Sequence, residues 1–308
     1  MPVPLADSGE YICHGITWAT GDPRLLLAPL PGGPLVYAEF MHRRLGFRVT
    51  GTGRWCTGRY QFADTVRVEA LACPDRAPAV QSGQCTQCAG RDDFRFAHQF
   101  HQRGHAPEAL QRYMAQPHWL YAATFADGTT KVGTAAEPRK RSRLDEQGAL
   151  FATYLAHSPD GRTVRYLEDA ITRHLGIPQT VRATAKLKAL ADLADLPTAE
   201  EAHRKTVDRA AKTFAELGTA TVLEAWTPPH EGDQLRNPGG ARALYPHKVD
   251  EGEHGFTLIS CIGSQALVVS DSDNDLGYLL DIGTLKGRRI TLGGAFTSPA
   301  AAVQASLF

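Results

Sequence analysis

The stretch HWLYAATFADGTTKVGT, residues 118–134, decides the fold of the central part of the chain. Two alternating runs of apolar and polar residues flank the pair Asp127-Gly128, and this dipeptide between such runs is a strong signal for a β-hairpin. Downstream, the sequence favours a helix over 138–150 that begins at Pro138, and then a short strand over 151–158, FATYLAHS. Strands and helices therefore alternate in this part of the chain.

A second helix is predicted over 163–175, TVRYLEDAITRHL. Val164, Leu167, Ile171 and Leu175 recur close to the 3.6-residue period of a helix, and Gly176 is a typical stop. The Ala- and Leu-rich residues 180–217 continue the helical pattern, with an expected break at Leu196-Pro197. A strand is expected over 219–226, TATVLEAW, and a loop over 227–247.

Outside this centre, both ends of the chain have β patterns. Residues 10–50 and the residues from 255 onward contain short runs of β-branched and aromatic residues that are separated by turn formers. Neither end is long enough to bury a sheet well alone, so we expect the two to pair in one barrel or sandwich. The predicted class is α+β, with four segments: an N-terminal β segment (1–50), a four-cysteine module (51–116), a central α/β domain with a helical extension (117–225) and a C-terminal β segment (226–308).

Composition limits the function classes. Lys and Arg number 33 and Asp and Glu number 33, so the net charge is zero and a polybasic coating protein is excluded. No stretch approaches the roughly 20 apolar residues of a membrane-spanning helix, and the N-terminus lacks the pattern of a signal peptide. The sequence therefore predicts a cytoplasmic protein without a membrane partner.

Four cysteines gather in one short segment. Cys85 and Cys88 form a C-x2-C pair that can place two thiolates on one metal from a single turn, and Cys56 and Cys73 supply two more ligands. In a reducing compartment this set predicts a structural Zn²⁺ site with a filled coordination shell. The alternative is a redox C-x-x-C pair, but no thioredoxin-like βαβ pattern surrounds it.

The central part carries a further pattern. Tyr121 ends a short W-L-Y run, K-V-G follows at 131–133, Arg143 ends a basic run, and Glu168 lies in the second helix. This order resembles the GIY-YIG nuclease superfamily. The whole chain resembles a bacterial and archaeal family, known as a domain of unknown function, that joins a four-cysteine module to a GIY-YIG-like domain. The pieces that match best are C-T-G at 56–58, C-P at 73–74, Q-C-x-x-C at 84–88, K-V-G at 131–133 and R-x-x-x-Q-G-A at 143–149.

The resemblance implies phosphodiester hydrolysis with a divalent metal. Tyr121 would help to activate water, Arg143 would steady the phosphate, and Glu168 would hold Mg²⁺, which supplies a Lewis acid. Lys131 stands where the superfamily has its second tyrosine; it is a phosphate contact, a base, or a sign of lost activity. Arg141 is the rival of Arg143 for the phosphate.

The basic run RKRSR, residues 139–143, predicts a nucleic-acid contact through Arg139, Lys140 and Arg141. The alternative interpretation of this run is a solvated helix face without a function. Likewise, Tyr121 can be an ordinary strand residue, and Glu168 can be an ordinary surface residue of its helix. Three functions stay open: a metal-dependent enzyme that acts on DNA or RNA, a non-catalytic nucleic-acid-binding protein, and a different enzyme on the same scaffold.

Overall fold

The computed structural model describes residues 3–4, 8–64, 66–80, 82–102, 106–191, 196–237, 239–271 and 273–300. Its content is mixed α/β, with β-rich ends, as the sequence predicts.

The two ends of the chain form one ten-stranded sheet. Its strands follow the order β1-β4-β3-β2-β16-β5-β13-β14-β15-β12. From the N-terminal side come β1 (Val3–Pro4), β2 (Ser8–Thr17), β3 (Arg24–Pro29), β4 (Val36–Glu39) and β5 (Arg44–Thr50). From the C-terminal side come β12 (Arg242–Leu244), β13 (Glu253–Ile262), β14 (Gln265–Ser270), β15 (Asp273–Asp281) and β16 (Arg289–Gly293).

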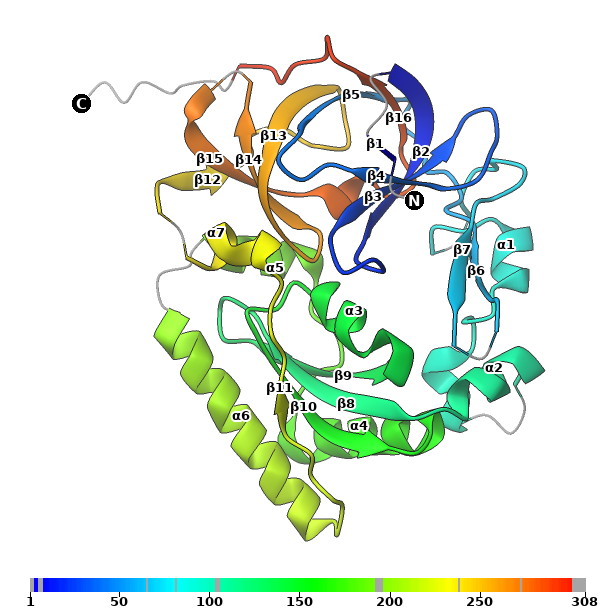
Figure 1. The fold of residues 1–308 in the computed structure, drawn as a ribbon, viewed down its shortest axis with the longest axis vertical. Helices are drawn as coiled ribbons and strands as arrows, with labels where there is room; N and C mark the ends of the chain where they lie inside the picture. The colour runs from blue at the N-terminus through cyan, green and yellow to red at the C-terminus, as the bar shows by residue number, and fades with distance from the viewer. Residues whose placement is uncertain are drawn as a thin grey trace.

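The pairing of β16 joins the two ends. It lies between β2 and β5, and β5 pairs in turn with β13, all antiparallel. An isolated bridge between Met41 and Leu258 connects the β4 side back to β13, so the sheet curves around its own core (Figure 1). Trp18, Phe47 and Phe256 fill that core, and the Trp18 indole donates a hydrogen bond to the Gly263 carbonyl over 2.9 Å.

A second, four-stranded sheet lies below the first in Figure 1, in the order β11-β10-β8-β9. Its strands are β8 (His118–Thr124), β9 (Thr130–Ala136), β10 (Phe151–Ser158) and β11 (Glu224–Ala225). The predicted hairpin around Asp127-Gly128 is present as β8 and β9. Because side chains alternate along a strand, Leu120 and Val132 pack with apolar residues of the helices on one face, while Tyr121 lies on the other face.

Helices α4 (Gly161–Leu175) and α6 (Leu196–Glu216) cover the first of these faces. The side chain of Asp160 caps α4 by accepting from the Thr163 amide, and Gly176 ends it in the left-handed conformation at φ 69°. Leu196 and Pro197, where we expected a break, begin α6, while α5 (Ala183–Ala191) ends before residues outside the described part. On the opposite face lie η2 (Glu137–Arg139) and α3 (Lys140–Asp145).

The cysteine-rich segment runs along the right-hand side of Figure 1 and contacts both sheets. It contains a two-stranded sheet and short helices: β6 (Arg59–Phe62), β7 (Val68–Leu71), α1 (Thr86–Arg91), η1 (Ala97–Gln102) and α2 (Glu108–Met114). The backbone amide of Trp55 donates to the carbonyl of Gly287, just before β16, and Ala136 of β9 packs among the apolar residues of the cysteine-rich segment.

Three expectations from the sequence need correction. The helix expected over 138–150 ends at Asp145, because Gly148 takes a φ of +72° that a helix cannot continue. The strand expected over 219–226 is only Glu224–Ala225. The loop expected over 227–247 contains η3 (His230–Gly232), α7 (Asp233–Arg236) and β12, held by the buried Leu235. A last short helix, η4 (Ile282–Leu285), precedes β16. Among the described residues, no helix combines the length and apolar character that crossing a bilayer requires.

Candidate functional site

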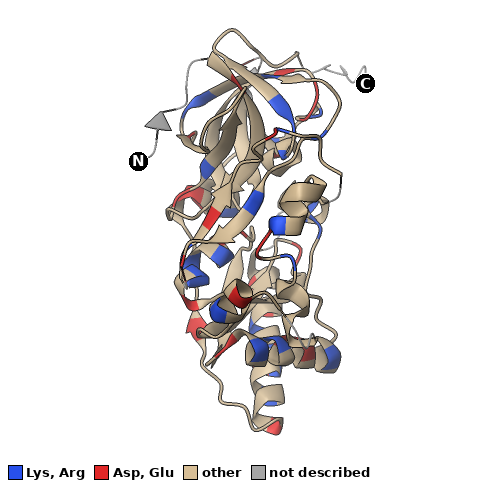
Figure 2. Cartoon of the chain, turned by 90° about the vertical axis from the view of Figure 1, so that its right-hand side faces the viewer, with Lys and Arg blue, Asp and Glu red and all other residues tan. Residues whose placement is uncertain are grey.

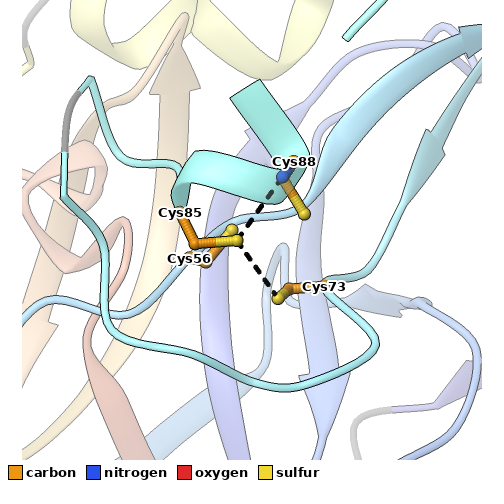
Figure 3. A group of neighbouring side chains, drawn as sticks. All are labelled: Cys56, Cys73, Cys85 and Cys88. Atoms are coloured by element: carbon orange, nitrogen blue, oxygen red, sulfur yellow. Dashed lines mark hydrogen bonds between the residues drawn. The ribbon is translucent and has the colours of Figure 1, made fainter. Parts of the chain in front are cut away.

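The four predicted cysteines form one compact cluster. Their Sγ atoms all lie within 4.8 Å of one another, all four side chains are buried, and the Cys73 and Cys85 sulfurs are 3.9 Å apart (Figure 3). Four sulfurs about 2.3 Å from a tetrahedral metal would be about 3.8 Å from one another. The cluster can therefore hold a structural metal such as zinc.

The local backbone gathers these sulfurs. Cys85 is the N-cap of α1, and its sulfur accepts from the amide of Cys88 over 3.5 Å. The Cys56 sulfur accepts from the amide of Gly58, which has a φ of +69° and no room for a side chain, since a Cβ there would lie 1.8 Å from the Leu71 carbonyl oxygen. Such sulfur–amide contacts are the geometry of a metal-binding turn.

A cavity of about 580 Å³ opens where the two sheets and the cysteine-rich segment meet. The ten-stranded sheet side supplies His14 and Lys286, and the cysteine-rich segment supplies Tyr60, Phe94 and His98. The four-stranded sheet and its helices supply Arg139, Arg143 and Arg165. An adjoining cavity of about 610 Å³ shares His14, Tyr60, His98 and Lys286 and adds Arg59 and Arg95.

These walls are rich in positive charge. Elsewhere basic and acidic residues are interspersed over the molecule (Figure 2). The two lining carboxylates have partners already: Asp92 accepts from the amides of Tyr60 and Phe94, and Glu146 accepts from Arg139 over 2.8 Å. The arginines and Lys286 thus outnumber the free acidic groups, and the hollow suits an anionic ligand.

Of the four residues predicted to be catalytic, only Arg143 lines this cavity, while Tyr121, Lys131 and Glu168 are buried. Tyr121 is completely buried, and its hydroxyl has no hydrogen-bond partner among the described residues. The Lys131 ammonium lies 5.7 Å from the centre of the Tyr121 ring. Arg143 lies close enough to Tyr121 that the tyrosine, more than any other group, raises the pKa of the guanidinium. Glu168 acts on the pKa of both Tyr121 and Lys131.

Lys131 has the most altered environment of the four. It is only 6% exposed, and its amine has no hydrogen-bond or ion-pair partner within the described ranges. Burial, followed by the charges of Arg143 and Lys186, lowers its pKa to about 7. An amine in this state exchanges a proton readily near neutral pH.

Glu168 is not arranged as a magnesium ligand. Its side chain is 4% exposed, and Oε2 accepts from the Arg165 guanidinium over 2.6 Å. The ion pair with Arg165 occupies the Glu168 carboxylate, and the charge of Glu168 acts on Lys131, whereas Mg²⁺ needs accessible carboxylate oxygens and room for several waters. Of the described residues, only the four cysteines form a group of three or more possible ligands. The Mg²⁺ expected at Glu168 does not fit these residues.

The residues of the predicted nucleic-acid-binding run lie in different environments. Arg139 lines the cavity and pairs with Glu146. Lys140 turns away, paired with Glu224 over 2.6 Å and with its amine 3.6 Å from the centre of the Trp119 ring. Arg141 is the most exposed, at 67%, and lies 3.7 Å from Asp145. It is Arg143, not its rival Arg141, that lines the cavity.

Sequence reasoning missed Arg165, His98, His14 and Lys286. Arg165 lies one turn before Glu168, and this spacing was a usable signal for a pair on one helix face. His98 reads as one of several histidines on a helical surface. His14 and Lys286 are brought to the cavity by strand pairing between distant segments, for which the sequence has no local signal.

One protein family matches more than half of the chain. A family model described as "Protein of unknown function (DUF2797)" matches residues 64–231. No curated protein and no solved structure matches the chain.

Proposed function

The chain belongs to the DUF2797 family of proteins of unknown function, and from this starting point we propose that it binds nucleic acid in the cationic cavity and cleaves a phosphodiester there. One observation carries the proposal: Arg139, Arg143 and Arg165 line one hollow, and the buried Tyr121 and Lys131 lie beside Arg143. A phosphodiester needs a proton acceptor and a cation against its developing negative charge. Lys131 and Arg143 have these two properties.

The roles follow from the surroundings of each residue. Arg143 and Arg165 face the phosphate from the cavity wall, and Lys131 exchanges the proton. Tyr121, completely buried beside Arg143, supports the position of that guanidinium. Glu168 holds Arg165 in position through their ion pair.

The metal of the cysteine cluster is Zn²⁺ in this proposal, because four thiolates in tetrahedral reach suit that ion. Its part is structural. It fixes the turns from which Tyr60, Phe94 and His98 reach the cavity, and a thiolate-bound zinc fits a reducing compartment such as the cytoplasm.

Two measurements test the function. Binding of labelled single-stranded and double-stranded DNA and RNA, at increasing salt, should show affinity that falls with salt as phosphate contacts release counterions. Cleavage of the same substrates should fall about 100-fold in Lys131→Met, while Lys205→Met, at an exposed lysine of α6 outside the cavity wall, should leave it unchanged. Salt-independent binding, or equal activity in both variants, would count against the proposal.

A second candidate is a non-catalytic nucleic-acid-binding protein on the same scaffold. The observation that favours it is the ion pair of Glu168 with Arg165, which occupies the carboxylate that a metal-dependent nuclease would need. Under this alternative the salt-dependent binding is present and no substrate is cleaved.

A further inference from the structure

Two aromatic side chains lie where the two cavities meet. Tyr60 of β6 and Phe94, which follows α1, line both cavities. Their ring centres are 6.0 Å apart and their planes are at 89°, so one ring meets the other by its edge. Such a contact covers at most one face of a ring, and Tyr60 is still 44% exposed. A flat aromatic ligand can therefore stack on the pair.

Backbone hydrogen bonds hold this aromatic pair in place. One carboxylate oxygen of Asp92 accepts from the Tyr60 amide over 2.9 Å, and the other accepts from the Phe94 amide over 2.8 Å. Gln84 donates to the same carboxylate over 2.8 Å and directly precedes Cys85 of the metal cluster. The cysteine cluster therefore anchors the pair, and a ligand that stacks on a fixed platform loses less binding energy to ordering.

Each of the two cavities that meet at this pair has arginines of its own. Arg139, Arg143 and Arg165 line the cavity of about 580 Å³. Arg59 and Arg95 line the cavity of about 610 Å³. The Arg59 guanidinium forms no ion pair with any carboxylate in the ranges that the structure describes. The order of groups is thus cations, an aromatic pair and cations again.

A single strand of nucleic acid has the complementary order of groups. Each unpaired base offers a flat ring for stacking, and a phosphate follows on either side of its sugar. In a duplex the bases are stacked inside, so a base reaches a side-chain ring only after the costly step of leaving the stack. The size of both cavities agrees with this, because small-molecule sites of about 300–1,000 Å³ have room for one nucleotide rather than for a duplex.

We propose that the nucleic acid is single-stranded, that one of its bases stacks on Tyr60 and Phe94, and that the arginines of the two cavities hold the phosphates on its two sides. The inference rests on the proposed function and narrows its substrate class. Stacking and phosphate contacts read neither the sugar nor the identity of the base, so single-stranded DNA and RNA should both bind.

The experiment measures the affinity of the full-length protein for four labelled probes of one length by fluorescence anisotropy. The probes are single-stranded DNA, single-stranded RNA, duplex DNA, and a DNA strand in which abasic sites replace all bases. The abasic strand keeps every phosphate, so it separates stacking from charge. We expect both single strands to bind at least about 10-fold more tightly than the duplex and the abasic strand.

Variants of Tyr60 test the stacking contact. Tyr60→Ala should weaken the binding of both single strands about 10-fold, because a stacked ring is lost, and should leave the abasic strand unaffected. Tyr60→Phe keeps the ring and should keep the affinity. Leu244→Ala is the control, since this side chain of β12 is 48% exposed and lines neither cavity. Thermal unfolding shows whether each variant is folded.

A variant of Arg59 tests whether the strand continues into the second cavity. Arg59→Ala should reduce the slope of log affinity against log salt by about one phosphate contact. Arg67→Ala is the control, because Arg67 lies in the loop of the same β6–β7 hairpin, is 70% exposed and lines neither cavity.

The outcomes separate this inference from the function on which it rests. Duplex or abasic DNA that binds as tightly as the single strand would overturn the inference and leave a nucleic-acid-binding protein. An unchanged affinity in Tyr60→Ala, or an unchanged salt slope in Arg59→Ala, has the same consequence. A parent protein that binds none of the probes at low salt would overturn both the inference and the proposed function.

Discussion

Gly133 lies directly opposite Tyr121 across the β8–β9 pair, and a Cβ at Gly133 would lie 2.5 Å from the Tyr121 hydroxyl oxygen. The K-V-G run therefore needs a glycine at this position for a steric reason, whatever its backbone conformation. It leaves room for the phenol ring to lie flat over β9. The position of the tyrosine hydroxyl beside Arg143 depends on this space.

Replacing Gly133 with Ala should therefore displace Tyr121 and destabilise the protein by roughly 1–3 kcal/mol, the usual range for overpacking a filled core. The free energy of unfolding in urea measures the effect. Gly240→Ala is the control, because a Cβ at Gly240 has no atom within 4 Å. Equal stability of the two variants would mean that the ring does not need this space.

The local elements were predictable because their signals are local. The hairpin at Asp127-Gly128, the stop at Gly176 and the strand at 151–158 each depend on a few neighbouring residues, and all three are present. The early end of α3 was not predictable in the same way, because the turn at Gly148 forms against Gln265, far along the chain. Tertiary packing set that boundary.

In the candidate site, too, the residues with local sequence signals could be predicted and those that depend on long-range packing could not. The four cysteines could be found from spacing alone, and they do cluster. That Lys140 would pair with Glu224 rather than face a ligand could not be found, because β11 joins the sheet only through long-range pairing with β10. The same holds for Arg165, whose role depends on the burial of Glu168.

Purified protein should contain one zinc per chain, and Cys85→Ser/Cys88→Ser should lose it. Elemental analysis measures the metal, and hydrogen exchange should show loss of protection over residues 54–90, because metal binding there is part of the folding free energy. Cys13→Ala is the control, since Cys13 lies in the core of the ten-stranded sheet, away from the cluster. Zinc retained in the double variant would place the metal elsewhere.

Arg139 and Lys140, neighbours in the basic run, should differ in their effect on nucleic-acid binding. Arg139→Ala should weaken binding and reduce the salt slope by about one phosphate contact, because Arg139 lines the cavity. Lys140→Ala should leave binding unchanged and lower stability, because its amine lies over the Trp119 ring and pairs with Glu224. Fluorescence anisotropy at several salt concentrations measures the first effect and urea unfolding the second. If Lys140→Ala weakened binding and Arg139→Ala did not, the nucleic acid would instead lie on the outer face of α3.

The last prediction concerns the ion pair of Glu168 with Arg165, two residues of α4, of which Arg165 lines the cavity. Both side chains are largely buried, at 4% and 14% exposed, so removing one partner leaves the other charge without compensation. Arg165→Met should lower the free energy of unfolding by roughly 3–5 kcal/mol, and Glu168→Gln by less, because the amide still accepts a hydrogen bond. The double variant Arg165→Met/Glu168→Gln should recover part of the loss, since no buried charge of the pair is left. Urea unfolding of the four proteins gives the coupling energy directly. If Glu168 bound a metal instead, Mg²⁺ would stabilise the parent and not Glu168→Gln, and Arg165→Met would bind the ion more tightly; stability that is independent of Mg²⁺ in all four proteins is the expected result.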